Sequence, residues 1–594
     1  MSKYLAFFAV LFVCGLVTPS WAQDGSARPE DNPTRDQKVQ FNGLGRTILN
    51  NTALTGELLE TDSTTARGLT DGEFLLDVNI NAQPNDKTEV QGILRIRNEF
   101  GGFFGAGVDV EVRELWARGL IGDVLRYRVG DFDHKMTPYT FFLPDEEGMV
   151  NEAALFQPQK DVIYYEQFYT GNNERRLQGG HLDFGLNFPA ILNDLDAEAF
   201  IARIRPTDFF TTPTRLVGGG SLNLTTQRLQ DTVGAFATVG VNWVNTWDDL
   251  QVGAVTSGIR NNVLSVNFDV LVLENKQLKL NVLGETGRSN LQTLVEQEKV
   301  ESEESDTFLD AGVELTLKEQ KVRIKANFLD VGPDFFSMAA QSRRVDLTQS
   351  KTFYNRIGND RAFRMPSLFD LSRDRGIYNF GIADRLMNYD PRYANVMPFG
   401  QATPNRRGLQ LNVSYGEAES PIEATLGAAF LSEIRGSGTF ELKRFTQIRA
   451  TANVNIHRML DWSNTCRVTL GLQQESTTRD GGEIEQVDLS STLLDVGLEA
   501  ELFPRFDVLL GGKFLTASGS DYVPEIVQLN DIRDFPGRFV AEDSESLVGA
   551  GLRYRFRNDI YLTIQYQQFN LEREMDPVND YGLRQVFAQY NMNF

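Results

Sequence analysis

One stretch of this sequence, between Val331 and Arg407, concentrates cationic and aromatic side chains. It contains eleven arginines, one lysine and seven aspartates, an excess of five positive charges in a 594-residue chain whose formal net charge is -23. Guanidinium groups bind carboxylates and phosphates through paired hydrogen bonds, and aromatic rings stack on flat or apolar groups. These residue types together predict a surface that binds anionic or sugar-like solutes.

The arginines of this stretch are the main candidate solute-binding residues: Arg343, Arg344, Arg356, Arg361, Arg364, Arg373 and Arg375. Three further candidate arginines lie outside this stretch: Arg323, Arg553 and Arg555. Two interpretations of the stretch stay open. It is either a loop folded into the interior of the protein, or an external loop whose arginines pair with its own aspartates.

Residues for other kinds of chemistry are sparse. The chain has three histidines, at scattered positions 134, 181 and 457, and no G-x-S-x-G element. Asp131 and Asp133 precede His134, but no second histidine is near in sequence, so we predict no metal site and no cofactor. We also predict that the protein is not an enzyme, although a lipid hydrolase with one Ser and one His stays open. The acidic run from Glu296 to Asp306 predicts a solvated loop between strands.

The elements that would position the arginines are strands, because apolar and polar residues alternate strictly over many segments. Leu309–Leu317 and Val322–Phe328 form one such pair, and Val548–Phe556 and Ile560–Gln567 form another. We expect about 18–22 antiparallel strands. The predicted fold class is all-β, a large transmembrane antiparallel β-barrel with a long Arg- and aromatic-rich insert at residues 331–405.

A closed barrel accounts for this pattern better than a sheet in water. An open sheet of this size would expose its edges and a whole apolar face, whereas a barrel in lipid pairs every backbone group. The mean hydropathy of -0.30 agrees with a barrel, since half of the strand side chains would face a polar interior. The sequence contains no repeat with a period of 20–50 residues, which would be typical of a propeller or a solenoid.

The sequence divides into three parts. Residues 1–22 are predicted to be a signal peptide cleaved after Ala22, with Lys3 before an apolar run. Residues 23–70 are predicted to be a flexible extension, and residues 71–594 the barrel. Within the barrel we expect a strand at Asp161–Tyr169 and a loop around the glycine run 218–220.

The C-terminus carries a recognisable motif. The last strand alternates Val586, Ala588, Tyr590, Met592 and Phe594 with polar residues, and it ends on an aromatic. This strand resembles the C-terminal signal of porin-like outer-membrane β-barrels of Gram-negative bacteria. The resemblance implies insertion into the cell outer membrane, contact with its lipids, and reading of Tyr590, Met592 and Phe594 by the barrel-assembly machinery. The segments 112–118 and 127–131 are similar to the early hairpin of alginate-export-like barrels.

The function predicted from these observations is an outer-membrane channel. It would pass small polar or anionic solutes, including saccharides, by diffusion through a lumen that the insert constricts. The alternative is a structural or secretion-associated barrel, plugged by the insert and acting through partner proteins. The acidic charge balance argues against nucleic acid as a partner. The sequence does not determine the oligomeric state.

Overall fold

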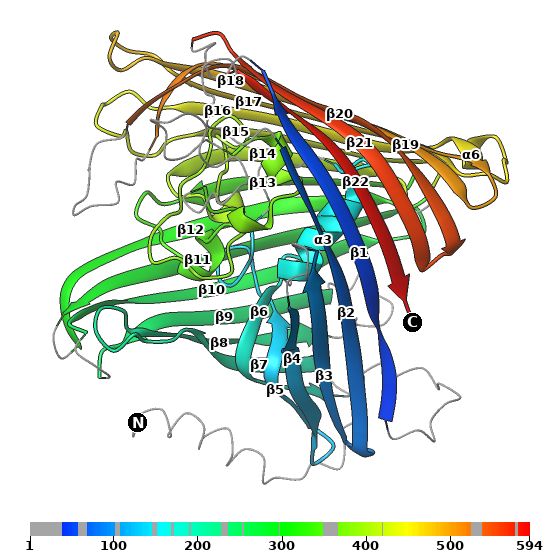
Figure 1. Ribbon diagram of the computed structural model, residues 1–594. Coiled ribbons are helices and arrows are strands. Elements are labelled where there is room, and N and C mark those ends of the chain that lie inside the picture. The colour runs from blue at the N-terminus through cyan, green and yellow to red at the C-terminus, as the bar shows by residue number, and fades with distance from the viewer. Residues whose placement is uncertain are drawn as a thin grey trace.

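The computed structural model describes residues 39–56, 68–100, 107–144, 151–167, 172–188, 192–226, 236–251, 255–295, 298–347, 366–417, 420–523, 537–575 and 580–594. Within these residues, 22 strands form a single sheet in which each strand pairs antiparallel with the next. The first strand also pairs with the last, so the sheet closes on itself. The predicted fold class, a large antiparallel β-barrel, is confirmed (Figure 1).

The strands are long and joined in chain order. The first eleven are β1 (Val39–Thr55), β2 (Gly68–Asn85), β3 (Thr88–Glu99), β4 (Val108–Ile121), β5 (Leu125–His134), β6 (Arg175–Asn187), β7 (Leu192–Arg205), β8 (Thr214–Thr226), β9 (Phe236–Asp249), β10 (Ser257–Glu274) and β11 (Leu278–Val295). The others are β12 (Lys299–Leu317), β13 (Val322–Val331), β14 (Arg406–Tyr415), β15 (Ile422–Ser432), β16 (Arg444–Asn455), β17 (Cys466–Arg479), β18 (Val487–Phe503), β19 (Phe506–Val523), β20 (Gly537–Arg557), β21 (Ile560–Arg573) and β22 (Tyr581–Asn593).

Closure joins β1 to β22 through twelve residue pairs, among them Gly45 with Met592 and Thr47 with Tyr590. At the end of the seam, the backbone N–H of Gly43 donates to the carbonyl of Phe594 at 2.9 Å, and the N–H of Phe594 donates back at 3.1 Å. Among the described residues, the first strand of the wall begins at Val39. This corrects the predicted boundary at residue 71, since the wall already contains much of the stretch assigned to a flexible extension.

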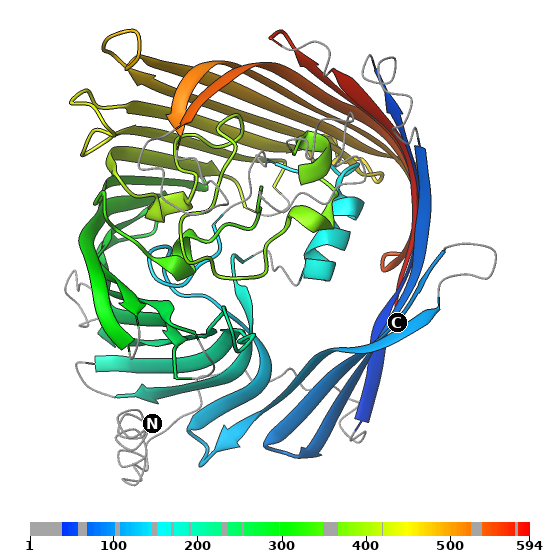
Figure 2. The same ribbon diagram turned by 60° about the vertical axis from the view of Figure 1, so that its left-hand side comes forward.

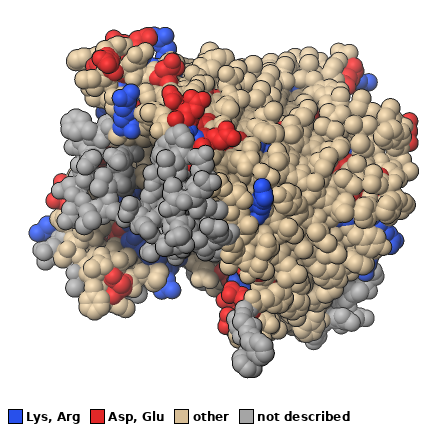
Figure 3. Space-filling view, turned by 45° about the horizontal axis from the view of Figure 1, so that its top comes forward, with Lys and Arg blue, Asp and Glu red and all other residues tan. Residues whose placement is uncertain are grey.

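The wall is apolar outside and polar inside. On β21, Ile564 and Tyr566 are about half exposed, whereas Gln565 and Gln567 between them are buried. On β18 the exposed Leu494 is followed by the fully buried Asp495. A flank of the space-filling surface is correspondingly poor in charge, with charged groups mostly near its borders (Figure 3). An apolar outer band with a polar interior is the arrangement of a barrel that spans a lipid bilayer.

Two long segments enter the barrel, between β5 and β6 and between β13 and β14. The first carries the helix α3 (Gln157–Gln167), and the second carries α4 (Met338–Gln341), α5 (Leu368–Leu371) and the 3-10 turns η2 (Arg375–Ile377) and η3 (Gly400–Ala402). Figure 2 shows both segments surrounded by the wall. We call them the luminal helix segment and the luminal insert. A further short helix, α6 (Ile456–Met459), lies between β16 and β17, and no helix among the described residues is long and apolar enough to cross a bilayer.

Apolar packing in the interior joins these segments to the wall. One cluster combines Leu155, Phe156 and Ile163 of the luminal helix segment with insert and wall residues. The wall makes room with glycines: a Cβ added at Gly511 would lie 2.9 Å from the Phe156 ring, and one at Gly551 would lie 2.9 Å from Leu155. Leu155 and Phe156 are completely buried, which contributes about 1.5–3 kcal/mol for each side chain.

Three local predictions were wrong. Residues 161–167 belong to helix α3, because Pro158 suits a first helical turn and the helix packs on several sides within the lumen. The glycine run 218–220 lies inside β8, where a Cβ at Gly219 would approach the Trp243 carbonyl to 2.4 Å. Of the acidic run, the residues from 299 onward lie in β12, exposed on both faces.

Candidate functional site

A group of arginines lies where helix α3 meets the wall. Arg46 comes from β1, Arg95 and Arg97 from β3, Arg113 from β4, and Arg375 from the luminal insert. Arg95 and Arg97 point to one side of their strand because side chains alternate with a period of two. We call these five residues the arginine cluster. Its members from the wall are buried or largely buried, and Arg375 is more exposed.

The arginine cluster surrounds one carboxylate, that of Glu166 near the end of α3. Arg46 Nη2 donates to Glu166 Oε1 at 2.5 Å and Arg95 Nη1 donates to Oε2 at 2.9 Å. Arg97 also donates to Oε2, and Arg375 approaches it to 3.7 Å. Glu166 is only 6% exposed, so this carboxylate is bound away from bulk water.

The preceding residue, Tyr165, fills the centre of the same group. Its hydroxyl donates to Asp77 on β2, and the Arg113 guanidinium lies 3.7 Å from its ring centroid. Arg95 makes a bidentate pair with Asp77, at 2.9 and 2.8 Å. Stacking and forked hydrogen bonds together fix the guanidinium planes in one orientation.

The electrostatics favour an anion at this place. Five guanidinium groups form ion pairs here with three carboxylates, those of Glu73, Asp77 and Glu166, which leaves two positive charges in excess. Burial would raise the pKa of the Glu166 carboxyl, but Arg46, Arg95, Arg97 and Arg375 outweigh it and lower that pKa to about 2. The arginine cluster therefore holds the carboxylate of Glu166, a side chain of the protein itself, in its ionised form.

The luminal insert is anchored on another part of the wall, at β17 and β20. Arg392 Nη2 lies 2.7 Å from Asp390, and its Nη1 lies 3.1 Å from Glu545 on β20. The Tyr393 hydroxyl donates to Glu545 at 2.8 Å, and the backbone N–H of Asn395 donates to Glu475 on β17 at 2.5 Å. Glu475 and Glu545 are almost inaccessible, so these contacts fix the insert to the inner face.

The predicted arginines of the insert lie in different surroundings. Arg343 is buried, donates to the Pro398 carbonyl and lies 5.7 Å from the Phe399 ring, and burial lowers its pKa to about 9. Arg344 is also buried. Arg373 donates to Gln585 of the wall at 3.1 Å and stacks on Phe369, and Arg375 joins the arginine cluster. Arg356, Arg361 and Arg364 lie outside the described residues.

The other three predicted arginines lie apart from the insert and are paired with wall carboxylates. Arg323 on β13 is 62% exposed and lies 3.8 Å from Glu314. Arg553 and Arg555 on β20 share Asp507, at 2.8 and 2.9 Å, and Arg553 also pairs with Glu499. They form a separate ionic network near the Arg557–Asp559 turn.

The four wall members of the arginine cluster were not predicted from the sequence. Arg95 and Arg97 are separated by one residue, which was the available signal for two cations on one face of a strand. Arg46 lies in a stretch that was assigned to the extension, and Arg113 was quoted only for a family resemblance. That these residues converge on Tyr165 and Glu166 depends on barrel closure and on the position of α3, which alternation does not predict.

The C-terminal residues named as an insertion signal lie in the closing strand. Tyr590 and Met592 pair with Thr47 and Gly45 of β1, and Phe594 lies next to Gly43, where a Cβ would approach the Phe594 ring to 2.7 Å. Phe594 is half exposed on the outer surface. Their part in recognition by an assembly machinery stays a prediction.

Comparison with known proteins gives structural matches alone, since no protein-family model and no curated protein matches the chain. A BenF-like porin from Pseudomonas fluorescens Pf-5 is 8% identical, with a TM-score of 0.31, over 94% of this chain and 99% of the porin. The ferric citrate transporter FecA in its unliganded form is 10% identical, with a TM-score of 0.48, over 93% and 78% of the two chains. The FrpB iron transporter from Neisseria meningitidis is 8% identical, with a TM-score of 0.44, over 93% and 82%. The matched proteins are outer-membrane β-barrels, and this chain has a closed barrel of the same general class.

Proposed function

We propose that this protein is an outer-membrane channel for small anionic solutes, carboxylates above all, and that its two luminal segments constrict the passage. The arginine cluster is the observation that carries this proposal. It presents five guanidinium groups on the inner side of the wall with two positive charges in excess, and it already binds a carboxylate in full hydrogen-bonded geometry. A solute carboxylate would use the same donors when Glu166 withdraws.

The barrel itself supports the location in a membrane. Its outer face is apolar and its inner face polar, and its strands are closed without a free edge between β1 and β22. Diffusion of a solute past the luminal segments requires no chemical step, and the proposed channel is not an enzyme.

The proposal is tested by the conductance of the refolded protein in a planar bilayer, with the reversal potential measured under a KCl gradient. We expect a stable conductance that prefers anions. Arg97→Gln combined with Arg375→Gln removes two partly exposed cations from the cluster and should shift the reversal potential toward cation preference. Arg444→Gln is the matched control, because Arg444 is highly exposed and paired with Asp480 at 3.1 Å. Equal shifts in the two variants would contradict the assignment.

A plugged barrel that acts through partners is the second candidate, and the anchoring of the insert favours it. Arg392, Tyr393 and Asn395 all bind carboxylates that are buried in the wall. A silent barrel that conducts only after deletion of residues 340–400 would give this candidate first place.

A further inference from the structure

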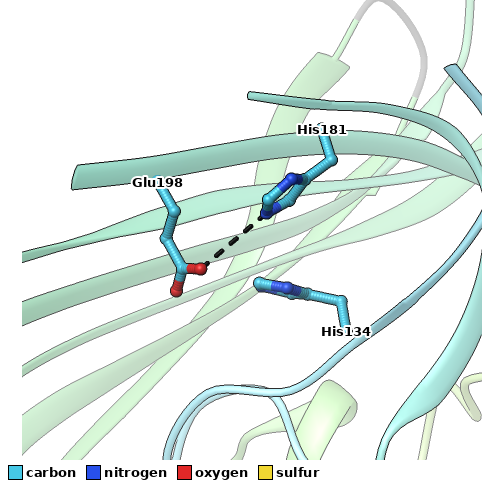
Figure 4. A group of neighbouring side chains, drawn as sticks. All are labelled: His134, His181 and Glu198. Atoms are coloured by element: carbon cyan, nitrogen blue, oxygen red, sulfur yellow. Dashed lines mark ion pairs between the residues drawn. The ribbon is translucent and has the colours of Figure 1, made fainter. Parts of the chain in front are cut away.

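Two histidines and a glutamate come together on the inner side of the wall, away from the arginine cluster. His134 is the last residue of β5, His181 lies on β6 and Glu198 on β7. One donor atom of each lies within 4.8 Å of the donors of the other two. Figure 4 shows that His134 approaches from its own segment toward the pair formed by His181 and Glu198.

This proximity is a product of the fold. In the register of β5 and β6, His181 is opposite Arg128, which is six residues before His134. A straight strand would separate those positions by about 20 Å, at about 3.3 Å per residue. The two imidazole centroids are nevertheless 5.3 Å apart. Because β5 and β6 stay paired as far as His134 and Arg175, the ends of the two strands bend together and bring His134 close to His181.

Opposed glycines permit such a bend. Gly130 has a φ of +106° and pairs with Gly179 across the two strands. A Cβ at Gly130 would lie 2.2 Å from the Leu115 carbonyl, and one at Gly179 would lie 2.0 Å from the Ile201 carbonyl. Glycine is required at both positions because backbone from the neighbouring strands approaches so closely.

His134 has an unused ligand atom. Its side chain is 6% exposed, and its Nε2 has no hydrogen-bond partner within the part of the chain that the structure describes. An unpaired polar atom in a buried position is costly, by about 1–3 kcal/mol. Neighbouring rings enclose it, with the Phe200 centroid at 4.3 Å and the Phe141 centroid at 5.7 Å.

The other two residues are held by partners of the kind found around metal ligands. His181 Nε2 lies 3.8 Å from Glu198 Oε2, and its Nδ1 lies 3.6 Å from Asp183 Oδ2. Glu198 Oε1 accepts a hydrogen bond from the Ser221 hydroxyl at 2.8 Å, which leaves Oε2 available. A carboxylate behind the second nitrogen of a histidine orients the ring and raises its basicity as a ligand.

The geometry points to a binding site for one divalent transition-metal ion, with His134, His181 and Glu198 as its protein ligands. Two imidazoles and one carboxylate suit zinc and the neighbouring first-row metals, whereas calcium and magnesium prefer oxygen ligands throughout. Tetrahedral ligands at about 2.0–2.1 Å from zinc lie about 3.3 Å from one another, so rotation of the side chains must close the present spacing. A fourth ligand such as water would reach the ion from the side on which His181 and Glu198 are partly exposed.

A metal ion here would connect the wall to the luminal helix segment, because that segment starts directly after His134. The ion would fix the bent end of β5 to β6 and β7. This site is distinct from the proposed solute path at the arginine cluster, and its test does not depend on transport.

The test is isothermal titration of the full barrel in detergent, produced without a polyhistidine tag, with ZnCl2 as the probe and MgCl2 as the comparison. We expect one zinc equivalent per chain, little response to magnesium, and an absorption spectrum typical of tetrahedral coordination when Co²⁺ replaces zinc. His134→Phe keeps a ring in the aromatic surroundings and removes the donor, and Glu198→Gln keeps the shape of the carboxylate. Each should weaken zinc binding by at least about 10–100-fold.

His457→Ala is the matched control, since His457 is the remaining histidine and its Nδ1 contacts the backbone of Cys466 on another part of the barrel. It should bind zinc as the parent protein does. Zinc should also raise the thermal midpoint of the parent and of His457→Ala, and raise that of Glu198→Gln by less. Absence of stoichiometric binding by the parent, or equal affinity in Glu198→Gln, would overturn the assignment.

Discussion

Glu166 Oε1 lies 2.5 Å from Arg46 Nη2, although 120 residues separate the two positions in the chain. Arg46 belongs to β1 of the wall and Glu166 to a helix inside the barrel. Their contact therefore fastens a luminal segment to the seam where the barrel closes, and it places a carboxylate of the protein among the arginines that we propose for solute binding.

Glu166→Gln should increase anion selectivity. The substitution keeps the side-chain shape but removes the negative charge, so the excess of positive charge in the arginine cluster rises from two to three. The reversal potential under a salt gradient should move toward the value for anions. Glu89→Gln is a suitable control, because Glu89 pairs with the exposed Arg118. A reversal potential that is the same in both variants would count against a solute path past Glu166.

The attachment of α3 should be sensitive to acid. The folded pKa of Glu166 is about 2, below its ordinary value of 4.5, so the stabilisation is complete above pH 4.5 and is lost as the pH falls toward 2. Its size is on the order of 3 kcal/mol. The protection factors of residues 157–167 against hydrogen exchange, each rate being compared with the intrinsic rate at the same pH, should fall over that pH range in the parent. In Glu166→Gln the protection factors should already be low at neutral pH, with no further fall in that range.

Arg392→Met should release the luminal insert. The substitution leaves Asp390 and Glu545 buried without their cation, and the loss of one partner of a buried ion pair costs about 3–5 kcal/mol. Limited proteolysis should cut the insert faster, and thermal unfolding should begin at a lower temperature. Arg444→Met removes an exposed partner of Asp480 and should cost less than about 1 kcal/mol. Similar effects of the two substitutions would show that the buried pair does not anchor the insert.

Gly511→Ala should displace the luminal helix segment. The added methyl group would meet Phe156 at 2.9 Å and Leu155 at 3.1 Å, both of that segment, and overpacking of this kind costs about 1–3 kcal/mol. Phe156→Leu should recover part of the loss, which a double-mutant cycle measures through the free energy of unfolding. Gly512→Ala, on the next residue, would contact Phe514 at 3.0 Å instead. Strictly additive effects of Gly511→Ala and Phe156→Leu would contradict the contact.

The fold was predictable because apolar outward residues and polar inward residues alternate along the wall strands with a period of two. The interval between β13 and β14 was also found, since alternation stops after Val331 and resumes near Arg406. Strand β1 was missed for a physical reason. Its outward positions 43 and 45 are glycines, which lie against Phe594 and Met592 of the closing strand. The alternation of apolar and polar side chains that predicts a strand is therefore interrupted at these positions.

Of the candidate site, the sequence predicted an excess of arginine in the insert, and Arg375 of the insert lies in the arginine cluster. Solute binding by these arginines stays a prediction. The rest of the arginine cluster is assembled from β1, β3 and β4, whose arginines meet because distant strands become neighbours of α3. Helix α3 was predicted as a strand because Val162, Ile163, Tyr164 and Tyr165 favour extended structure locally, whereas tertiary packing in the lumen selects the helix.

The seam between β1 and β22 has a consequence for how the molecule is made. Thr47 can pair with Tyr590 only after nearly the whole chain has left the ribosome. Strand β1 therefore stays unpaired with β22 until synthesis is almost complete. Until then the growing sheet has two unpaired edges that can recruit another chain. The last strand therefore closes the barrel in one late step. Any truncation of the C-terminus should leave both edges unpaired and produce a protein prone to aggregate rather than a smaller barrel.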